Sequence, residues 1–383
     1  MSQWHIKKAA ILVSLCTAFV TATAADNPRG AASGEPYKIG GLLASTGRLA
    51  SMGNDQKEGM MVAQKVINAA GGINGRPIQV IFEDMEGDPA KAISLAKKLV
   101  GDDKVIGITG LNTEAGAAAI REYMDRSEVP FFGASTQPGF TDGFNYAFAL
   151  VNDSIVDTRI IAEQIAKRGW KRVGILYEAN NPYGVIQYEG VKKVSEQLGG
   201  TVLGAKFQSA DQDLMPVWLN IKEHKPDVVF IAGSSYAPGA TALRNRRAAG
   251  LGNVPVVMSI PYQSAAFVKL AGPNAEGVYF GGYYKYGNLP AGSKRLFDAM
   301  EQSFPGKFVS AHHGLGWDGV HILAAAAKAA GPDGKKMKTW IENLRGYEGA
   351  RGTFNFAPNQ HRADVPVRVV QWTKGAWKDV TSN

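Results

Sequence analysis

The chain has 383 residues, 42 Lys and Arg against 34 Asp and Glu, and a formal net charge of +8. This length exceeds one ordinary domain and suits two. The basic side chains are scattered or form short pairs, such as Lys192-Lys193, so they indicate a solvated surface and argue against nucleic acid as a partner. The single cysteine, Cys16, lies near the N-terminus, so the chain after it can form no disulfide and no thiolate metal site.

Residues 1–24 have the layout of a secretory signal peptide. Lys7 and Lys8 precede an apolar run over residues 9–20, and small residues follow up to Ala24. The run is shorter than the roughly 20 residues that a membrane-spanning helix needs. We therefore expect cleavage near Ala24, export to a bacterial periplasm, and a flexible leader over residues 25–36. The alternative is a buried N-terminal helix.

From residue 37 onward, short apolar runs alternate with helical patterns. Several runs, such as DVVFIAG at 227–233, are almost wholly apolar, as in strands of a parallel sheet that is covered on both faces. The expected strands are 37–43, 78–83, 105–109, 129–133, 172–178, 202–207, 227–233, 254–260 and 277–284, with two late strands at 352–356 and 365–372.

The segments between these strands carry helix signals. Met60, Ala63 and Ile67 lie on one helical face, and Asp88 can cap a helix in which Pro89 fits the first turn. Further helices are expected at 115–125, 153–168, 182–198, 214–225, 238–249, 292–303, 311–330 and 335–344. Strands and helices that alternate in this way predict an α/β fold with right-handed crossovers and parallel sheets.

Motifs of the common catalytic and cofactor sites are absent from the sequence. It contains no GxxxxGK(S/T), no HExxH and no GxSxG, and the first strand is followed by Ala-Ser-Thr-Gly at 44–47 in place of a GxGxxG loop. His313 and His321 are eight positions apart, but a metal site needs three or four convergent ligands. We therefore expect no catalytic residue, no metal and no cofactor, although an α/β enzyme and a structural envelope protein remain alternatives.

Small and hydroxyl-bearing residues follow two strands of the first half. Asn112 and Thr113 come after strand 105–109, and Ala134, Ser135 and Thr136 come after strand 129–133. Ligands of open α/β sheets bind beyond the carboxyl ends of the strands, and amides at helix starts favour anions. These residues are therefore candidates to bind a carboxylate. The alternative is that Thr113 and Ser135 are plain helix caps.

Two tyrosines occupy equivalent places in the second half. Tyr183 follows strand 172–178 and Tyr236 follows strand 227–233. A tyrosine can offer both a ring and a hydroxyl to a ligand. A ligand bound between two halves would then meet donors on one side and aromatic walls on the other. The alternative places both rings on the surface.

The chain resembles the type I periplasmic binding proteins of the branched-chain amino acid (Leu/Ile/Val) class. The resemblance spans nearly all of the chain after the leader. Its motifs occur in the family's order: STGRLASMG at 45–53, INAAGGINGRPIQV at 67–80, EDMEGDPAKAISLAKKLV at 83–100, GASTQPGF at 133–140, ILYEANNPYG at 175–184, ALRNRRAAGL at 242–251 and LGWDGVHILAAAAKAAG at 315–331.

The resemblance implies two Rossmann-like lobes, joined by three crossover hinge segments, with a ligand cleft between them. Residues 37–153 and 285–355 would form lobe 1, and residues 154–284 and 356–383 would form lobe 2. The implied function is the solute-binding component of an ABC importer, which closes around a small ligand and delivers it to a membrane permease. A monomer is expected. An exported ligand-sensing domain is the alternative role.

The resemblance also implies site residues. In relatives, the ligand α-carboxylate is held at positions that match Thr113, Ala134 and Thr136. Other contacts match Tyr183, Tyr236 and Met52. Relatives that bind amino acids carry a glutamate for the ligand ammonium after the strand matching 254–260. Here the stretch Met-Ser-Ile-Pro-Tyr-Gln at 258–263 contains no acid.

This departure bears on the ligand, because an unpaired ammonium in a closed cleft is costly. It favours an aromatic or other organic acid without an amine, with Arg48, Tyr262 and Gln263 as further contacts. Arg48 is equally well a surface residue at the cleft mouth. The alternative is a hydrophobic or branched-chain amino acid with a different ammonium partner, for which Glu114 and Glu178 are the nearest acids.

Overall fold

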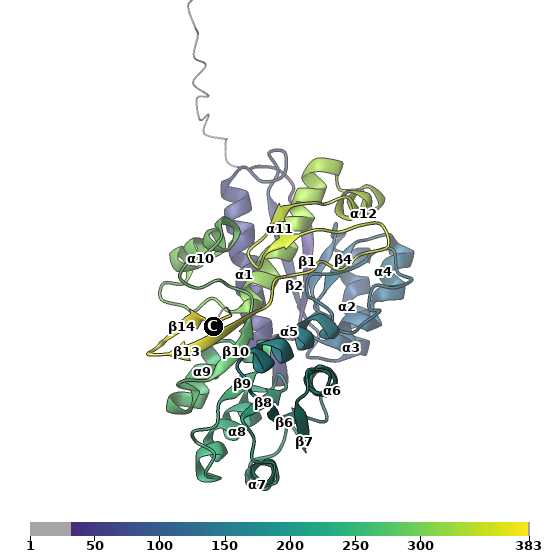
Figure 1. Cartoon of the computed structure of the whole chain (residues 1–383). Coiled ribbons are helices and arrows are strands. Elements are labelled where there is room, and N and C mark those ends of the chain that lie inside the picture. The colour runs from purple at the N-terminus through teal and green to yellow at the C-terminus, as the bar shows by residue number, and fades with distance from the viewer. Residues whose placement is uncertain (1–31, 382–383) are drawn as a thin grey trace, which may run out of the picture.

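The first half of the chain builds a five-stranded parallel sheet. The computed structural model describes residues 32–381 (Figure 1). The strands are β1 (Tyr37–Leu43), β2 (Ile78–Asp84), β3 (Ile108–Gly110), β4 (Phe131–Gly133) and β5 (Ala147–Ala149), and their order is β2-β1-β3-β4-β5. We call this sheet and the helices packed on it lobe 1.

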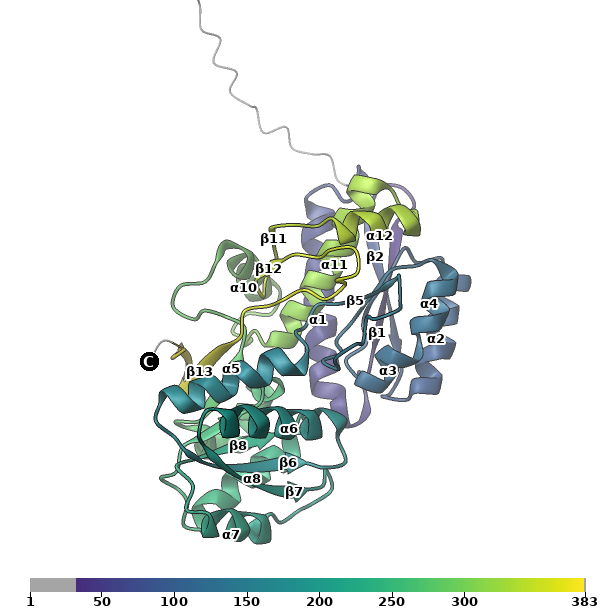
Figure 2. The same ribbon diagram turned by 45° about the vertical axis from the view of Figure 1, so that its right-hand side comes forward.

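Helices cover both faces of the lobe 1 sheet, as Figure 2 shows. Successive residues of β1 point to opposite faces: Leu42 packs into the core under α2, and Leu43 packs into the core under α1 and α11. The helices are η1 (Gly47–Leu49), α1 (Ala50–Ala69), α2 (Pro89–Gly101), α3 (Glu114–Ala119), α4 (Arg121–Ser127), α10 (Ala291–Ser303), α11 (Ala311–Ala330) and α12 (Gly334–Glu342). A small hairpin of β11 (Tyr347–Glu348) and β12 (Thr353–Phe354) follows α12.

The second sheet has seven strands, in the order β14-β13-β10-β9-β8-β6-β7. The strands β6 (Arg172–Glu178), β7 (Thr201–Phe207), β8 (Val228–Ala232), β9 (Val256–Met258) and β10 (Tyr279–Gly282) are parallel, and β7 lies at one edge. The last strands, β13 (Arg368–Thr373) and β14 (Ala376–Asp379), add to it antiparallel. With α5 (Ser154–Lys167), α6 (Pro182–Gln197), α7 (Met215–Glu223), α8 (Tyr236–Ala248), α9 (Ala265–Ala271), η2 (Ile260–Tyr262) and η3 (Gly272–Ala275), this sheet forms lobe 2.

The predicted α/β class with parallel sheets is confirmed. Strands 37–43 and 172–178 have the expected bounds, and helix 311–330 coincides with α11. The strand expected at 105–109 starts later, at Ile108, because the Val105 amide bonds back to Leu99 O in α2. Strand β5 was not predicted, since a run of three residues gives no periodicity, and the same holds for β11 and β14.

Helices α1 and α11 cross at unusually short range because glycines lie at the contact. A Cβ atom on Gly59 would lie 2.0 Å from His313 O, and one on Gly316 would lie 2.1 Å from Gln56 O. Side chains at these positions would force the two helices apart. The crossing fixes the start of α11 beside the start of α1, where both helices face lobe 2.

The chain passes between the lobes three times: after β5, after β10 and before β13. Asn152, on the first crossing, donates to Val365 O on the third at 2.8 Å and accepts from the Val365 amide at 2.6 Å. Ala149 of β5 bridges to Arg362, so the third segment stays with the lobe 1 sheet beyond residue 356, where lobe 2 is expected to resume. The lobe boundaries stay a prediction.

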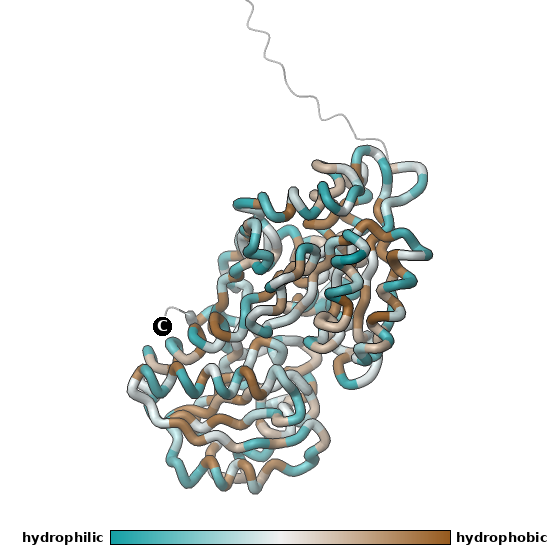
Figure 3. The backbone as a smooth tube through the Cα atoms, turned by 90° about the vertical axis from the view of Figure 1, so that its right-hand side faces the viewer, coloured by the Kyte–Doolittle hydropathy of each residue, from teal (hydrophilic) through white to brown (hydrophobic). Residues whose placement is uncertain are grey.

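Hydrophobic residues follow the strands and the inner faces of the helices, while hydrophilic residues lie along the outer helix faces (Figure 3). In the described range 32–381, no helix is long and apolar enough to cross a membrane. The proposed signal peptide and most of the leader, residues 1–31, lie outside the described residues.

Candidate ligand-binding site

A cavity of about 320 Å³ lies between the lobes. Lobe 1 lines it with residues that follow β1, β3 and β4, and lobe 2 lines it with residues that follow β6, β8 and β9. Val151 and Tyr283, on the first two crossings, also line it. The cavity therefore occupies the carboxyl ends of the strands in both sheets, where open α/β folds bind ligands. Its volume is at the lower end of the usual range of small-molecule pockets, roughly 300–1,000 Å³.

The structure brings most of the candidate residues to this cavity. From lobe 1 and lobe 2 together, the lining includes Arg48, Met52, Asn112, Thr113, Ala134, Thr136 and Tyr183. Asn112 also stabilises the loop after β1, since its Oδ1 accepts from the Ala44 amide at 2.7 Å. Thr113 Oγ1 caps α3 by accepting from the Gly116 amide at 3.0 Å. Both residues are therefore helix or loop anchors that also face the cavity.

Four candidates lie behind the cavity wall. Tyr262 is fully buried, and its ring packs 4.8 Å from that of Phe267, centroid to centroid. Tyr236 packs against the same phenylalanine at 5.8 Å. Gln263 is buried and donates from Nε2 to Tyr286 Oη at 2.6 Å. Ser135 is buried and donates to Glu114. None of these four is among the lining residues, because each is used in packing or in an internal hydrogen bond.

Glu114, the first residue of α3, lines the cavity and turns its carboxylate toward the β4 loop. Its Oε1 accepts from the Thr136 amide at 2.8 Å and from Thr136 Oγ1 at 2.9 Å. Its other oxygen accepts from Ser135 Oγ. Two of the residues predicted to hold a ligand carboxylate, Ser135 and Thr136, therefore already bind a carboxylate of the chain.

Asp157 is a buried acid in the cavity wall, on the first turn of α5. Asn152 donates to its Oδ1 at 2.9 Å. Burial raises the pKa of the Asp157 carboxyl group to about 7. The hydrogen bond from Asn152 lowers that pKa and offsets only part of the effect of burial. Sequence reasoning missed Asp157, because an acid in the first turn of a helix is common for helix stability alone.

Arg351 reaches the cavity from the loop between β11 and β12. Its Nε lies 3.1 Å from Asp318 Oδ2 in a pair without exposed side-chain surface, and its Nη2 donates to Leu150 O at 2.8 Å. Its Nη1 is buried with no hydrogen-bond partner among the described residues. A buried cationic donor at a cavity wall can bind an anionic or carbonyl oxygen of a ligand.

His312 also lines the cavity. Burial lowers its pKa to about 3, so the ring is neutral at physiological pH. It therefore adds a ring wall with hydrogen-bonding nitrogens and no charge. Neither Arg351 nor His312 carried a sequence signal, because their approach to the cavity depends on the return of residues 285–355 to lobe 1.

Arg48 connects the lobes at the cavity mouth. Its Nη1 donates to Ser235 Oγ at 2.8 Å and lies 3.9 Å from Glu178 Oε1. Burial would raise the pKa of Glu178, but hydrogen bonds from Ser209, Ser235, Asn181 and the Ser234 amide hold that pKa below its usual range. Glu178 is therefore an ionised carboxylate behind the wall, and it does not line the cavity.

With this geometry in place, comparison with known proteins gives the family. A family model described as "Periplasmic binding protein" matches residues 36–376. The chain belongs to the periplasmic binding protein family. The resemblance inferred from the sequence motifs is thereby confirmed, and the family is one of binding proteins, in agreement with the prediction that the chain is not an enzyme.

Curated relatives of this periplasmic binding protein are named for branched-chain amino acids. The Leu/Ile/Val-binding protein homolog 3 of Brucella melitensis is 22% identical over 343 residues, which cover 88% of this chain and 91% of the relative. The leucine-, isoleucine-, valine-, threonine- and alanine-binding protein of Pseudomonas aeruginosa is 24% identical over 340 residues, with 86% and 88% covered.

Solved structures show the same fold. LivJ, the substrate-binding protein of a branched-chain amino acid transporter from Streptococcus pneumoniae in complex with isoleucine, matches with a TM-score of 0.83 at 24% identity, covering 90% of this chain and 99% of that one. A solute-binding protein of an ABC transporter from Rhodopseudomonas palustris, in complex with 3,4-dihydroxybenzoic acid, matches with a TM-score of 0.79 at 23% identity, covering 90% and 96%. The predicted fold of a type I periplasmic binding protein is confirmed.

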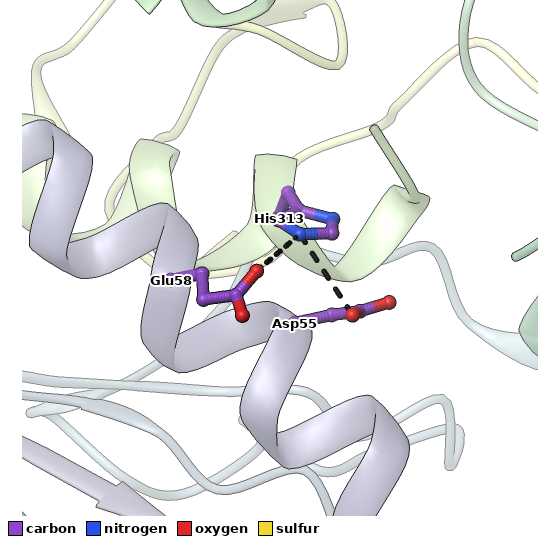
Figure 4. Close-up of side chains that lie close together, drawn as sticks. All are labelled: Asp55, Glu58 and His313. Carbon is purple, nitrogen blue, oxygen red and sulfur yellow. Dashed lines mark hydrogen bonds and ion pairs between the residues drawn. The ribbon is translucent and has the colours of Figure 1, made fainter. Parts of the chain in front are cut away.

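One cluster of the periplasmic binding protein has the composition of a metal site. In the described part of the chain, Asp55, Glu58 and His313 bring ligand atoms within 4.8 Å of one another (Figure 4). However, His313 Nδ1 accepts from the Ser310 amide at 3.0 Å, so the ring proton is on Nε2, which lies 3.2 Å from Glu58 Oε2. A protonated Nε2 has no lone pair for a metal.

Lys307 also pairs with Glu58, which places a fixed cation next to the same carboxylate. The hydrogen bonds from His313 and Lys307, working against burial, hold the pKa of Glu58 below its usual range. The residues of the cluster are thus satisfied by one another. Their role is to tie α1 to the start of α11, and they do not suit a metal ion.

Proposed function

We propose that this periplasmic binding protein is the solute-binding component of a bacterial ABC importer, and that it takes up a small carboxylate-bearing ligand without converting it. The observation that carries the proposal is the cavity enclosed by residues of both lobes at the carboxyl ends of their strands. The chain is exported, with cleavage near Ala24, and its closed form docks on a membrane permease.

The ligand has an apolar body and a polar head. Leu49, Met52 and Leu315 give the cavity an apolar wall, and Tyr183 gives it a ring. Arg48 and Arg351 offer positive charge to a carboxylate. These features suit an aromatic or other organic acid, or a hydrophobic or branched-chain amino acid. The names of similar proteins include both branched-chain amino acids and an aromatic acid, which supports this range of ligands.

Branched-chain amino acid binding with an unusual ammonium partner is favoured by one observation. The stretch after β9 offers Pro261 to the cavity where amino-acid binders of the family carry a glutamate, but Glu114 lines the cavity from the opposite lobe. A carboxylate there can balance an ammonium that would otherwise be buried alone.

Binding proceeds by hinge closure around the crossings. A ligand favours the closed form only to the extent that it binds that form more tightly than the open one. Arg48 and Ser235 approach each other only when the lobes meet, so their hydrogen bond belongs to the closed form. Closure then presents a surface made of both lobes to the permease.

The test is a thermal-shift screen of the mature chain, unfolded and refolded to remove carried-over ligand. The panel holds leucine, isoleucine, valine, phenylalanine, 4-hydroxybenzoate, 3,4-dihydroxybenzoate and short aliphatic acids. A ligand at 100 times its Kd adds about 2.7 kcal/mol to the free energy of unfolding. Mass spectrometry after incubation should recover the bound compound unchanged. Chemical conversion of the compound, or no shift with any of them, would contradict the proposal.

A further inference from the structure

Glu114 occupies the hydrogen-bond donors of Ser135 and Thr136 in the loop after β4, of which Thr136 lines the cavity. The Thr136 amide and Thr136 Oγ1 donate to Oε1 at 2.8 and 2.9 Å, and Ser135 Oγ donates to Oε2. Ser135 is fully buried and Thr136 is 7% exposed, so these donors have little access to other partners. The loop is satisfied by the chain itself and has no donor left for a second carboxylate.

A ligand carboxylate in this place would meet the Glu114 carboxylate at short range. Like charges within a few ångströms repel strongly where water is excluded, and both would compete for the same donors. A ligand head that donates a hydrogen bond can instead be accepted by Glu114, because Oε2 accepts only from Ser135 Oγ and has a further lone pair.

We propose that Glu114 is a specificity-determining residue that selects a ligand with an N–H donor head, either a protonated amine or an amide, over the corresponding free acid. The inference rests on the proposed function and narrows its ligand class. A carboxylate elsewhere on the ligand, as in a zwitterion, is then left to Arg351, whose Nη1 has no partner within residues 32–381. Glu114 thus takes the part of the glutamate that is missing after β9.

The experiment compares ligands with the same body and different heads. Leucine and leucinamide are paired with 4-methylpentanoate, and phenylalanine and phenylalaninamide are paired with 3-phenylpropanoate. Kd values are measured by isothermal titration on the refolded wild-type chain, on Glu114→Gln and on Glu122→Gln. Glu122 is the matched control, because it does not line the cavity and its carboxylate pairs with Arg126 on the exposed surface of α4.

We expect the amine and amide compounds to bind wild type at least about tenfold more tightly than their acid counterparts. Glu114→Gln should lose about tenfold in affinity for the amines and gain affinity for the acids, while Glu122→Gln keeps the wild-type order. Circular dichroism and the melting temperature without ligand show whether the variant folds. The wild-type comparison needs no variant and decides the inference even if Glu114→Gln does not fold.

Two results separate the inference from the proposed function. If a free acid binds wild type as tightly as its amine or amide counterpart, Glu114 does not select the head, and the inference is overturned while the binding function stands. If none of these compounds and none of the wider panel binds, the proposed function fails, and the inference fails with it.

Discussion

Arg48 Nη1 donates to Ser235 Oγ at 2.8 Å, although the two residues are 187 positions apart and belong to different lobes. The buried carboxylate of Glu178 lies 3.9 Å from the same guanidinium nitrogen. Hydrogen bonds from lobe 2 residues alone keep Glu178 ionised. Its carboxylate is therefore already negative when closure brings Arg48 near it. Closure therefore gains a polar contact at the mouth that is independent of the ligand.

Replacing Arg48 should weaken closure without unfolding either lobe. The Arg48 side chain is 46% exposed, and a hydrogen bond of this kind is worth about 1 kcal/mol, so Arg48→Gln should raise the Kd of a bound ligand by about fivefold. Arg126→Gln, which removes an exposed pair on α4, is the control and should leave the Kd unchanged. Equal Kd values for wild type and Arg48→Gln would show that the contact plays no part in closure.

Asp157 should make stability fall as the pH rises. Its pKa is about 7 in the folded chain against 3.8 for an unperturbed aspartic acid, so the folded state binds more protons between these values. The stability that the protonated form provides is present below about pH 4 and is lost as the pH rises through 7, by as much as about 4 kcal/mol. Asp157→Asn cannot ionise and should be more stable than wild type at pH 8 and no more stable at pH 4.

Denaturant unfolding of wild type and Asp157→Asn at pH 4, 6 and 8 measures this difference. Asp298→Asn, which removes an exposed carboxylate beside Lys294, is the control. A stability gap between wild type and Asp157→Asn that stays constant with pH would mean that Asp157 is ionised throughout.

The glycines between α1 and α11 should not tolerate a methyl group. Alanine at Gly59 or Gly316 would place Cβ within 2.0 or 2.1 Å of a backbone oxygen, so the helices must separate, at a cost of about 1–3 kcal/mol or more. Gly101→Ala, at the end of α2 with open space around it, should be neutral or slightly stabilising. Melting temperatures of the three variants measure the effect, and equal melting temperatures would refute the close crossing.

Arg351 should be essential to the fold as well as to the cavity. Arg351→Met leaves the buried Asp318 carboxylate without its cation, which should cost about 3–5 kcal/mol. Adding Asp318→Asn should recover part of that loss, because the unpaired charge is gone. Urea denaturation of the single and double variants gives the coupling energy. A double variant that loses the sum of the two single effects would show that the pair is not coupled.

Local sequence patterns were enough to predict many of the strands and helices of both lobes. Mainly apolar runs predicted β1 and β6 with the bounds observed, because buried parallel strands need such runs. Asp88 caps α2 as expected, accepting from the Ala90 amide at 2.7 Å. The cavity-lining Thr113 and Thr136 were also predicted, since residues that follow strands in such folds necessarily meet at one edge.

The rest of the site depends on contacts that no local pattern contains. Glu114 reaches Thr136 only because β3 and β4 are neighbours, and Arg351 arrives from a segment that returns to lobe 1 after two crossings. Tyr236 and Tyr262 follow strands as expected, but packing against Phe267 takes them behind the wall. Sequence position predicted which edge each residue joins, and side-chain packing decided whether it faces the cavity.

A small molecule should bind inside the cavity between the lobes. The most direct measurement is calorimetric unfolding of the refolded chain with and without the tightest ligand of the panel, in wild type, in Ala134→Trp and in Ala69→Trp. Ala134 lines the cavity, whereas Ala69 is exposed at the end of α1. We predict that the ligand stabilises wild type and Ala69→Trp equally and leaves Ala134→Trp unchanged. An equal ligand-induced shift in all three proteins would place the ligand elsewhere and contradict this account.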